Sequence, residues 1–405
     1  MRILQGSYFY GPFGGVERYV RELSLHQREA GHEIELLTRR VIGEPKDGFR
    51  VHVLPDAEKV TKEERIRGDA EGLRRAVAEF RPDLIHLHNN WEAEFTRACL
   101  ELAPTVRSIH DHTLFCPGLN KEHADRSNCF TPAGWRCWVQ LAQGGCDCWK
   151  LPLKRAWRVY WDKMDDIRAN KRLPRLITPS EYMRQELLAI GFGARQVEVN
   201  ELYVDLLDPP PVFTPADPPR ILCVGRMVLP DKGADFLLEC LARIDRPFQA
   251  DLVGDGPHFE AIKNLAGKLG LAGRVTLHGW VEAAEKDRLY RNANVFAFPA
   301  TWKEPVGFVG FEAMVYGLPV VAQDVGGIKE WLCEGEIGHV TPPKDPAAYA
   351  AALARLCADP ETCRRMGQNG QRLVAERFQR KDHLARLEKT YEEVLARLSA
   401  RREGP

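Results

Sequence analysis

The chain has 405 residues, enough for two domains of about 200 residues, each with its own core. Hydrophobic residues make up 44% of the sequence and charged residues 28%, which excludes disordered, collagen-like and small disulfide-rich classes. The 57 Lys and Arg residues are balanced by 57 Asp and Glu residues, and neither half has a nucleic-acid binder's basic excess. We therefore expect no nucleic-acid partner.

No stretch approaches the roughly 18 consecutive apolar residues that cross a bilayer, and the apolar run before Gly6 is too short for a secretory signal. The expected compartment is therefore the cytoplasm. Because a reducing cytoplasm disfavours disulfides, the 11 cysteines are interpreted first as buried thiols or metal ligands.

Strands and helices alternate along the first half of the chain. A short apolar strand leads through a Gly/Pro turn into a helix with apolar residues at helical spacing, and another strand follows. This alternation predicts a mainly parallel sheet with right-handed crossovers, in a domain over 1–205. Its expected strands lie at 2–7, 33–38, 83–88 and 105–111.

A proline-rich stretch at 206–219 cannot continue a helix or a central strand, so it is the expected linker. A second α/β series over 220–378 predicts another parallel sheet, so the chain is expected to form two Rossmann-like, doubly wound domains that face a cleft. The amphipathic tail at 379–405 could pack back on the first domain. The strands expected in the second domain lie at 221–225, 250–254, 275–279, 295–299 and 319–324.

Ligands of open parallel sheets bind at the carboxyl ends of the strands, so the turns there should carry the chemistry. Gly14 and Gly15 close the first such turn, where glycine would let an anion approach the N–H groups of a helix start. A plain tight turn explains these glycines equally well. Because the turn lacks G-x-G-x-x-G and no ribose-binding acid follows at the expected place, a nicotinamide dehydrogenase is set aside.

Two cations follow the first strand of the second domain. Arg226 comes directly after the strand, and Lys232 ends the loop before the next helix. Beside a helix N-terminus they would hold a diphosphate. Taken in isolation, two solvated surface charges would be the better interpretation.

The most informative segment contains Glu304 and Glu312, with seven residues between them. It follows a strand and begins a helix. Each carboxylate can accept two hydrogen bonds from vicinal hydroxyls of a sugar or ribose. The intervening Gly307-Phe308-Val309 offers backbone N–H groups to a phosphate. A favourable interaction with the helix dipole would explain Glu304 but not Glu312, which lies deeper in the helix.

Together these elements resemble the retaining, family-four glycosyltransferases of GT-B fold, over nearly the whole chain. The resemblance implies transfer of a sugar from a nucleoside-diphosphate sugar to a hydroxyl of a saccharide or lipid-linked saccharide, with polysaccharide or glycoconjugate biosynthesis as the setting. It implies no metal cofactor. The motifs that carry it are Gly14-Gly15, His110-Asp111, Gly225-Arg226 with Lys232-Gly233, Gly254-Asp255-Gly256-Pro257, and Glu304-x7-Glu312.

The resemblance also implies how the donor is bound. Arg226 and Lys232 would hold the diphosphate, Glu312 would hold the ribose, and the backbone near Val281 would face the base. The loop between Arg226 and Lys232 has five residues, one more than the common family spacing, so we expect it to bulge around Pro230.

The reacting end of the donor is assigned in the same way. Glu304 and the Gly307-Phe308-Val309 backbone would hold the transferred sugar and the distal phosphate. Gly15 would approach the phosphate, and His110 would contact the sugar at its reacting face. Without the resemblance, His110 would be interpreted as a hydrogen-bonded core histidine. Since charge builds on the leaving diphosphate, cations and helix N–H groups aimed there would stabilise the transition state.

Cysteines crowd into an insertion near 116–148. Their spacing, with twelve, seven, eight and one residues between successive members, is not the paired C-x2-C form of a zinc site. Buried free thiols are therefore favoured, although a structural metal is an alternative. The cysteines are Cys116, Cys129, Cys137, Cys146 and Cys148.

The segment 150–175 carries nine basic and three acidic residues with aromatic residues interleaved. A basic aromatic helix could make peripheral contact with the inner face of a membrane, which would suit a lipid-linked acceptor. A half-buried helix whose basic side chains extend past an aromatic core is the slightly favoured alternative.

Two other functions remain open. A GT-B-fold epimerase would interconvert nucleotide sugars without an acceptor, but the Glu304-x7-Glu312 element argues against it. A non-catalytic nucleotide-sugar-binding protein would bind the donor without turning it over. The two glutamates are interpreted as hydroxyl-binding groups and not as the paired acid and base of a hydrolase.

Overall fold

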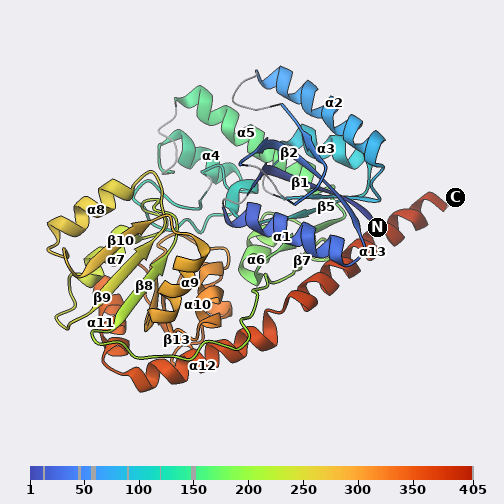
Figure 1. Ribbon diagram of the computed structural model, residues 1–405. Helices are drawn as coiled ribbons and strands as arrows, with labels where there is room; N and C mark the ends of the chain where they lie inside the picture. The colour runs from blue at the N-terminus through green and yellow to red at the C-terminus, as the bar shows by residue number, and fades with distance from the viewer. Residues whose placement is uncertain are drawn as a thin grey trace. The chain divides into compact units, whose positions relative to one another are not determined.

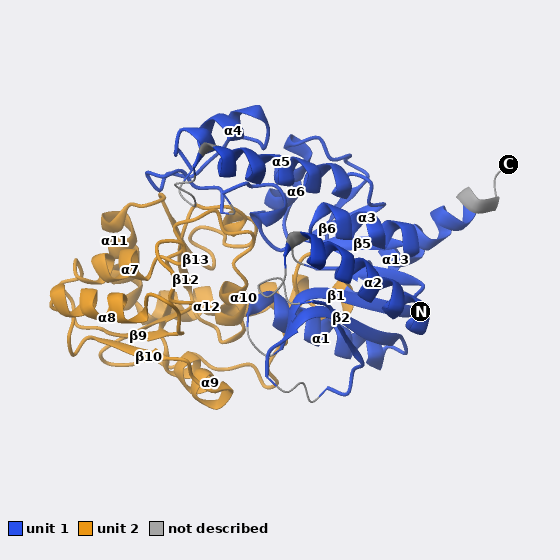
Figure 2. Cartoon of the chain, turned by 90° about the horizontal axis from the view of Figure 1, so that it is seen from above, with its two compact units in different colours: residues 1–200, 384–405 blue, residues 201–383 orange. Residues whose placement is uncertain are grey.

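The computed structural model describes residues 1–11, 14–43, 47–55, 61–88, 91–118, 120–146 and 152–403. The chain divides into two compact units (Figure 2). Unit 1 contains Met1–Asn200 and Leu384–Pro405, and unit 2 contains Glu201–His383. Within the described ranges, no helix is long and apolar enough to cross a membrane.

Unit 1 is built on a parallel sheet (Figure 1). In the described part of the chain, this sheet has seven strands in the order β3-β2-β1-β4-β5-β6-β7. The strands are β1 (Arg2–Tyr10), β2 (Glu33–Val41), β3 (Val51–Val53), β4 (Leu84–Leu87), β5 (Thr105–Ser108), β6 (Arg175–Thr178) and β7 (Val197–Val199). The helices are α1 (Gly15–Glu29), α2 (Lys62–Phe80), α3 (Ala93–Leu102), η1 (His112–Leu114), α4 (Trp135–Ala142), α5 (Leu153–Asn170) and α6 (Glu181–Ala189).

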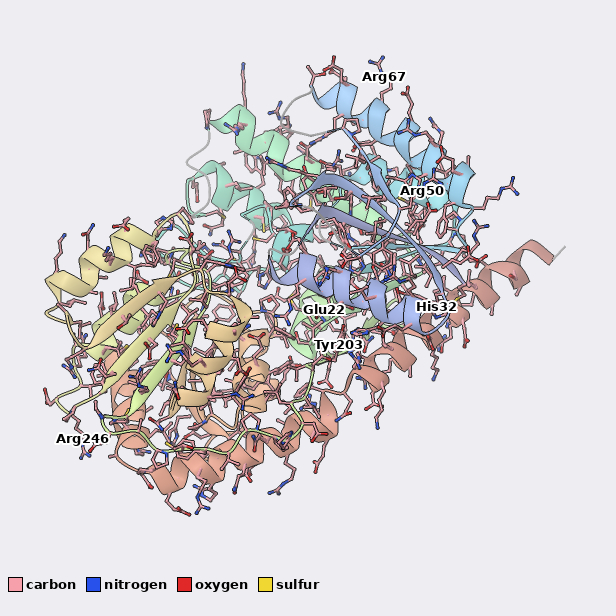
Figure 3. The ribbon with its side chains drawn as sticks, viewed as in Figure 1. Glu22, His32, Arg50, Arg67, Tyr203 and Arg246 are labelled. Carbon is pink, nitrogen blue, oxygen red and sulfur yellow. The ribbon has the colours of Figure 1, made fainter. Side chains whose placement is uncertain are left out.

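Both faces of this sheet are covered by helices, because alternate residues of each strand point to opposite sides. On one face, Leu4 and Ile85 pack against α2 and α3. On the other face, Ile3 and Leu84 pack against α1 and the C-terminal helix α13 (Arg380–Glu403). His32, labelled in Figure 3, lies 3.0 Å through Nε2 from a carboxylate oxygen of Glu388 in α13. Most of α13 is thus part of unit 1.

Unit 2 is built on a second parallel sheet, with six strands among the described residues in the order β10-β9-β8-β11-β12-β13. The strands are β8 (Arg220–Val224), β9 (Gln249–Val253), β10 (Val275–Gly279), β11 (Val295–Phe298), β12 (Val320–Gln323) and β13 (Gly338–Thr341). The helices are α7 (Ala234–Leu241), α8 (Phe259–Lys268), α9 (Ala283–Asn292), α10 (Phe308–Val315), η2 (Ile328–Glu330), α11 (Pro346–Cys357) and α12 (Pro360–Arg377).

The second sheet is doubly wound as well. Ile221 and Val295 pack on one face with α7, α8 and α11. Leu222 and Phe296 pack on the other face with α9, α10 and α12. Two parallel-sheet α/β units, each with helices on both faces, confirm the expected fold class.

Local sequence signals set where several helices begin. Thr61 and Glu64 form a capping box at the start of α2. Asp345 and Asp359 cap α11 and α12, each followed by a proline in the first helical turn, where a missing N–H has no cost. These caps satisfy N–H groups that a helix leaves without partners.

The strand order fixes where ligands should bind. In unit 1 the order reverses between β1 and β4, and in unit 2 it reverses between β8 and β11. Loops that leave neighbouring strands in opposite directions open a crevice at such a point, at the carboxyl ends of the strands. The residues after β1, β4, β8 and β11 therefore lie where a ligand of each sheet would bind.

Candidate active site

The loops after β8 and β9 pack backbone against backbone. Gly254 has a φ of +132°, and a β-carbon there would lie 1.9 Å from the carbonyl oxygen of Gly225. The N–H of Met227 donates to the carbonyl of Asp255 at 3.0 Å, which ties the loops together. Only glycine fits at position 254, so the Gly225-Arg226 turn is held by a neighbouring turn that tolerates no side chain.

A second set of contacts ties the β8–α7 loop to the segment after β11. Gly233, with a φ of +68°, caps α7, and a β-carbon there would lie 2.0 Å from the carbonyl oxygen of Pro299. The hydroxyl of Thr301 donates to the carbonyl oxygen of Pro230 at 2.9 Å. The backbone N–H of Thr301 donates to the carbonyl oxygen of Asp231 at 3.1 Å. These contacts bring the end of the loop, Lys232, beside the start of the Glu304 segment.

Lys232 and Glu304 form an ion pair at this point. The Lys232 ammonium lies 3.0 Å from Oε2 of Glu304, and the same oxygen accepts a 2.6 Å hydrogen bond from the indole N–H of Trp302. The ammonium also lies 4.8 Å from the centre of the Trp302 ring. A cation and a largely buried carboxylate, predicted from separate motifs, are therefore neighbours between the N-termini of two helices.

The backbone of Glu304 is held as firmly as its side chain. The N–H of Gly327 donates to the Glu304 carbonyl at 2.9 Å. Gly326 has a φ of +58°, and a β-carbon there would lie 2.0 Å from the same oxygen. A loop that admits no side chain thus fixes the position of Glu304.

Glu312 lies on α10 and is bound by two side chains of α9. The Lys286 ammonium donates to both carboxylate oxygens, at 2.8 and 3.0 Å, and the Tyr290 hydroxyl lies 3.3 Å from one of them. Burial and the nearby carboxylate raise the pKa of Tyr290 well above its ordinary value, so its hydroxyl stays protonated and can donate. Sequence reasoning missed Lys286 and Tyr290, whose spacing of four residues puts them on one face of α9.

The start of α10 offers backbone donors. Gly307 caps the helix with a φ of +80°, and no side chain caps it. A β-carbon on Gly307 would lie 2.7 Å from the Ile328 side chain, which explains the glycine. The first N–H groups of α10, at Phe308 and Val309, lie at the positive end of the helix dipole.

The remaining expected donor residues lie around the same sheet edge. Arg226 is exposed in the loop after β8. Val281 is partly buried just before α9, next to Trp280, whose side chain is exposed. The contacts of the structure thus join Lys232 with Glu304 and hold Glu312 through α9, and no contact found among the described residues joins Arg226 or Val281 to them.

In unit 1, a glycine turn and a group of buried polar side chains follow β1, β4 and β5. Gly14, with a φ of +87°, precedes α1, which no side chain caps. Gly15 is exposed, and among the described atoms a β-carbon there would meet nothing within 4 Å. Position 15 therefore leaves room in front of a helix N-terminus.

His110, two residues past β5, contacts His88 at the end of β4. Nε2 of His110 lies 3.1 Å from Nδ1 of His88, the rings are stacked at 5.4 Å, and the Tyr19 ring packs edge-on against His110 at 5.2 Å. His88 in turn lies 2.8 Å through Nε2 from Oε1 of Gln5. Neither His88 nor Gln5 was predicted, although polar residues inside apolar strands need buried partners and could have indicated them.

The described cysteines of the insertion, Cys116, Cys129, Cys137 and Cys146, are free thiols. Burial raises the pKa of Cys116 to about 11 and that of Cys146 to about 12, with smaller contributions from neighbouring thiols. Among the described residues, no group of three or more His, Cys, Asp or Glu is arranged to hold a metal ion. Cys148 lies outside the described residues.

Comparison with known proteins assigns the class. The family models Glycosyltransferase Family 4 and Glycosyl transferases group 1 match residues 13–206 and 208–373. The sucrose-phosphate synthase of Thermosynechococcus elongatus superposes with a TM-score of 0.74 at 23% identity, over 98% of this chain and 99% of its own. Anabaena Alr3699/HepE in complex with UDP superposes with a TM-score of 0.71 at 19% identity, over 97% and 100%. The fold is therefore GT-B.

Two curated relatives carry activities in their names. The MMP alpha-(1->4)-mannosyltransferase of Mycolicibacterium hassiacum is 26% identical over 96% of both chains. The GDP-mannose-dependent alpha-(1-6)-phosphatidylinositol monomannoside mannosyltransferase of Mycolicibacterium smegmatis is 34% identical over 42% of this chain and 47% of its own. Several such relatives match over about half of their own length.

Together these matches confirm the expected class, a hexosyltransferase-type glycosyltransferase. The chain belongs to family four of the glycosyltransferases, with one family model on each of its two α/β regions.

Proposed function

We propose that the protein transfers a hexosyl group from a nucleoside-diphosphate sugar to a hydroxyl of a saccharide or lipid-linked saccharide, with retention at the anomeric carbon. The Lys232–Glu304 pair between the starts of α7 and α10 carries the proposal, because it sets a cation, a sugar-binding carboxylate and two helix N-termini together. Mannosyltransferases among the relatives, and HepE in complex with UDP and with UDP-glucose, support a donor of this chemistry.

Unit 2 would bind the donor. The ammonium of Lys232, the guanidinium of Arg226 and the N–H groups that begin α10 would meet the diphosphate, while Glu304 would accept hydrogen bonds from the sugar hydroxyls. Glu312 would accept hydrogen bonds from the ribose, with Lys286 holding the carboxylate in place. The backbone at Val281 would face the base.

The chemical step breaks the bond between the anomeric carbon and the leaving diphosphate oxygen and forms a bond from that carbon to the acceptor oxygen. The acceptor proton passes to the leaving phosphate. Negative charge grows on the diphosphate, where Lys232 and the helix N-termini stabilise it in a fixed arrangement. Gly15 would approach the phosphate from the start of α1, and His110 would contact the sugar being transferred.

Calorimetric titration with UDP, GDP, dTDP, ADP and NAD tests donor binding. One nucleoside diphosphate should bind to the unmodified protein, and Glu312→Ala should weaken it by about tenfold to a hundredfold, because hydrogen bonds to a charged group are lost. Glu285→Ala, which removes an exposed carboxylate of α9 paired with Arg288, is the matched control. Binding of NAD alone, or equal affinity in the Glu312 variant, would contradict the assignment.

A specific surface favours a lipid-linked acceptor. Trp135, Trp157 and Trp161 are 70%, 51% and 40% exposed on α4 and α5, and we call them the tryptophan surface. The Arg168 guanidinium lies 5.7 Å from the Trp161 ring, and Arg158 is also exposed on α5. Aromatic rings beside cations suit the boundary of an anionic membrane. The part of the expected 150–175 segment before residue 152 lies outside the described residues.

Vesicle co-sedimentation separates this surface from an ordinary exposed helix. Vesicles containing phosphatidylglycerol should pellet the protein, whereas pure phosphatidylcholine vesicles should not, and Trp157→Ala combined with Trp161→Ala should abolish the binding. Trp280→Ala, which removes a tryptophan that is 61% exposed in unit 2, should leave it unchanged. Equal binding by the double variant would exclude the α5 part of the tryptophan surface as the contact.

A further inference from the structure

A continuous chain of buried hydrogen bonds runs in unit 1 from His110 to the C-terminal helix. His110 contacts His88, His88 contacts Gln5 of β1, and Nε2 of Gln5 donates to Oε1 of Gln27 on α1 at 2.6 Å. Nε2 of Gln27 donates at 3.1 Å to the hydroxyl of Tyr391 on α13. Gln5, His88 and Tyr391 are fully buried, so each polar group must find its partner inside the protein.

The chain fixes which atom donates at each step. Because the amide nitrogen of Gln5 donates to Gln27, the amide oxygen of Gln5 faces His88 and accepts its Nε2–H. A neutral imidazole with its proton on Nε2 has a lone pair on Nδ1, so Nδ1 of His88 accepts from His110. His110 therefore carries its proton on Nε2.

The far end of the chain is closed by a second histidine. The Tyr391 hydroxyl, which accepts from Gln27, donates its own proton to Nδ1 of His86 at 2.7 Å. Nε2 of His86 then donates to the hydroxyl of Ser108 at 2.9 Å. The Tyr391 hydroxyl thus has both a donor and an acceptor as partners. If the oxygen and nitrogen of one glutamine amide changed places, every other hydrogen bond of the chain would have to change its direction as well.

His88 is held neutral by its surroundings. Burial lowers the pKa of His88 well below its ordinary value, and the neighbouring His86, His110 and Arg107 lower it further. A second proton on His88 would point an N–H at the N–H of His110. The neutral form is therefore the one compatible with the contact between the two rings.

We infer that His88 is a positioning residue for His110, and that Tyr391 of the C-terminal helix acts on His110 through Gln27, Gln5 and His88. Together they hold His110 in one ring orientation and in the Nε2–H tautomer, in which it would contact the bound sugar. The inference rests on the proposed contact between His110 and the sugar. It assigns to α13 a part in the reaction besides the packing of unit 1.

The decisive variant is Tyr391→Phe, which keeps the ring and removes one hydroxyl. With the donor found by calorimetry, turnover should fall by about tenfold with little change in the KM for the donor, the effect expected when one buried hydrogen bond ceases to orient a reacting group. The ¹⁵N shifts of the His110 ring should move from those of a single Nε2–H tautomer toward a mixture. Tyr349→Phe is the matched control, since its buried hydroxyl donates at 2.8 Å to the Val321 carbonyl in unit 2.

A pair of substitutions at His88 keeps the inference testable if Tyr391→Phe folds poorly. His88→Asn retains an oxygen near the position of Nδ1 and should preserve the His110 tautomer and most of the turnover, whereas His88→Leu should lose both. Equal turnover and unchanged ¹⁵N shifts in Tyr391→Phe, or equal loss in the two His88 variants, would overturn the inference. If the unmodified protein catalysed neither transfer nor donor hydrolysis, the proposed function would be contradicted. The inference about His110 would be judged separately, because the ¹⁵N shifts report its tautomer without turnover.

Discussion

Single residues in unit 2 show how the charges of the candidate site are balanced within the protein. Glu304 is largely buried, and Lys232 and Trp302 both bind its Oε2. A diphosphate would compete with Glu304 for the Lys232 ammonium, which would leave the carboxylate to the sugar hydroxyls. At Glu312 the balance is different, because Lys286 binds both carboxylate oxygens and would hold the carboxylate in place for the ribose.

Replacing Lys232 should therefore affect catalysis more than folding. In Lys232→Ala, turnover should fall by about a hundredfold to a thousandfold, because a fixed cation no longer meets the charge that develops on the diphosphate. Steady-state kinetics with the cognate donor measures the effect. Lys329→Ala, which removes a lysine paired with Asp324 on the surface, should stay close to the unmodified enzyme. If the KM for the donor rose and turnover stayed unchanged, Lys232 would bind the donor and the transition state equally.

The thiols of the insertion give a prediction that depends on pH. With pKa values of about 11 and 12, Cys116 and Cys146 hold less than about one part in a thousand as thiolate at pH 7.5. Iodoacetamide should therefore modify the exposed Cys333 first, and the rates at Cys116 and Cys146 should rise about tenfold for each pH unit below those pKa values. Peptide mass spectrometry of the folded protein measures each site. Protection that a strong chelator removed would indicate bound metal and contradict the buried-thiol interpretation.

The proximity of some site residues could be predicted from sequence. Lys232 and Glu304 follow strands whose carboxyl ends meet at one sheet edge, so their motifs alone place them near each other. Lys286 and Tyr290 could not be found in this way, because their closeness to Glu312 depends on how α9 packs against α10. His88 was likewise missed, although a polar residue at the end of an apolar strand needs a buried partner and could have indicated it.

At the scale of elements, glycines set how closely helices and loops approach the sheet edges. Gly307 begins α10 with a positive φ and leaves no space for a β-carbon. Long apolar strands and the helices between them were predictable from their periodicity. The short β3, β6, β7 and β13 were not predicted, because three or four residues hold little pattern to tell a strand from a loop.

Gly307→Ala should destabilise unit 2. The expected loss is about 1–3 kcal/mol, because alanine is strained at this φ and its β-carbon would collide with Ile328. Gly267→Ala is the opposite control: it lies inside α8, where a β-carbon meets nothing within 4 Å, and should stabilise by about 0.5–1 kcal/mol. Differential scanning calorimetry measures both. Equal unfolding temperatures in the two variants would show that the cap geometry does not constrain α10.

At the scale of the whole molecule, the chain leaves unit 1 after Asn200 and returns to it at Leu384. α13 therefore begins in unit 2 and ends in unit 1. Its Leu387, Tyr391 and Val394 complete the core on one face of the first sheet. An amphipathic tail was predictable from sequence, but the face it covers depends on apolar positions of strands far away along the chain.

Cavity-forming substitutions should separate the two units in a thermal scan. Leu387→Ala should lower the stability of unit 1 by about 2–5 kcal/mol, because it leaves a cavity between α13 and the sheet. Leu353→Ala removes an equally buried leucine of α11 and should act on unit 2. If both substitutions shifted one and the same calorimetric transition, the units would unfold together.

The return of the chain to unit 1 has a consequence for the order of events during translation. Domains usually fold as they leave the ribosome, in order from the N-terminus. Here α1 covers only part of the sheet face that carries Ile3 and Leu84 until residues 384–403 have been made, whereas every strand of unit 2 is available earlier. The second unit can therefore complete its fold first. The nascent first unit keeps part of one apolar face uncovered until α13 has been made.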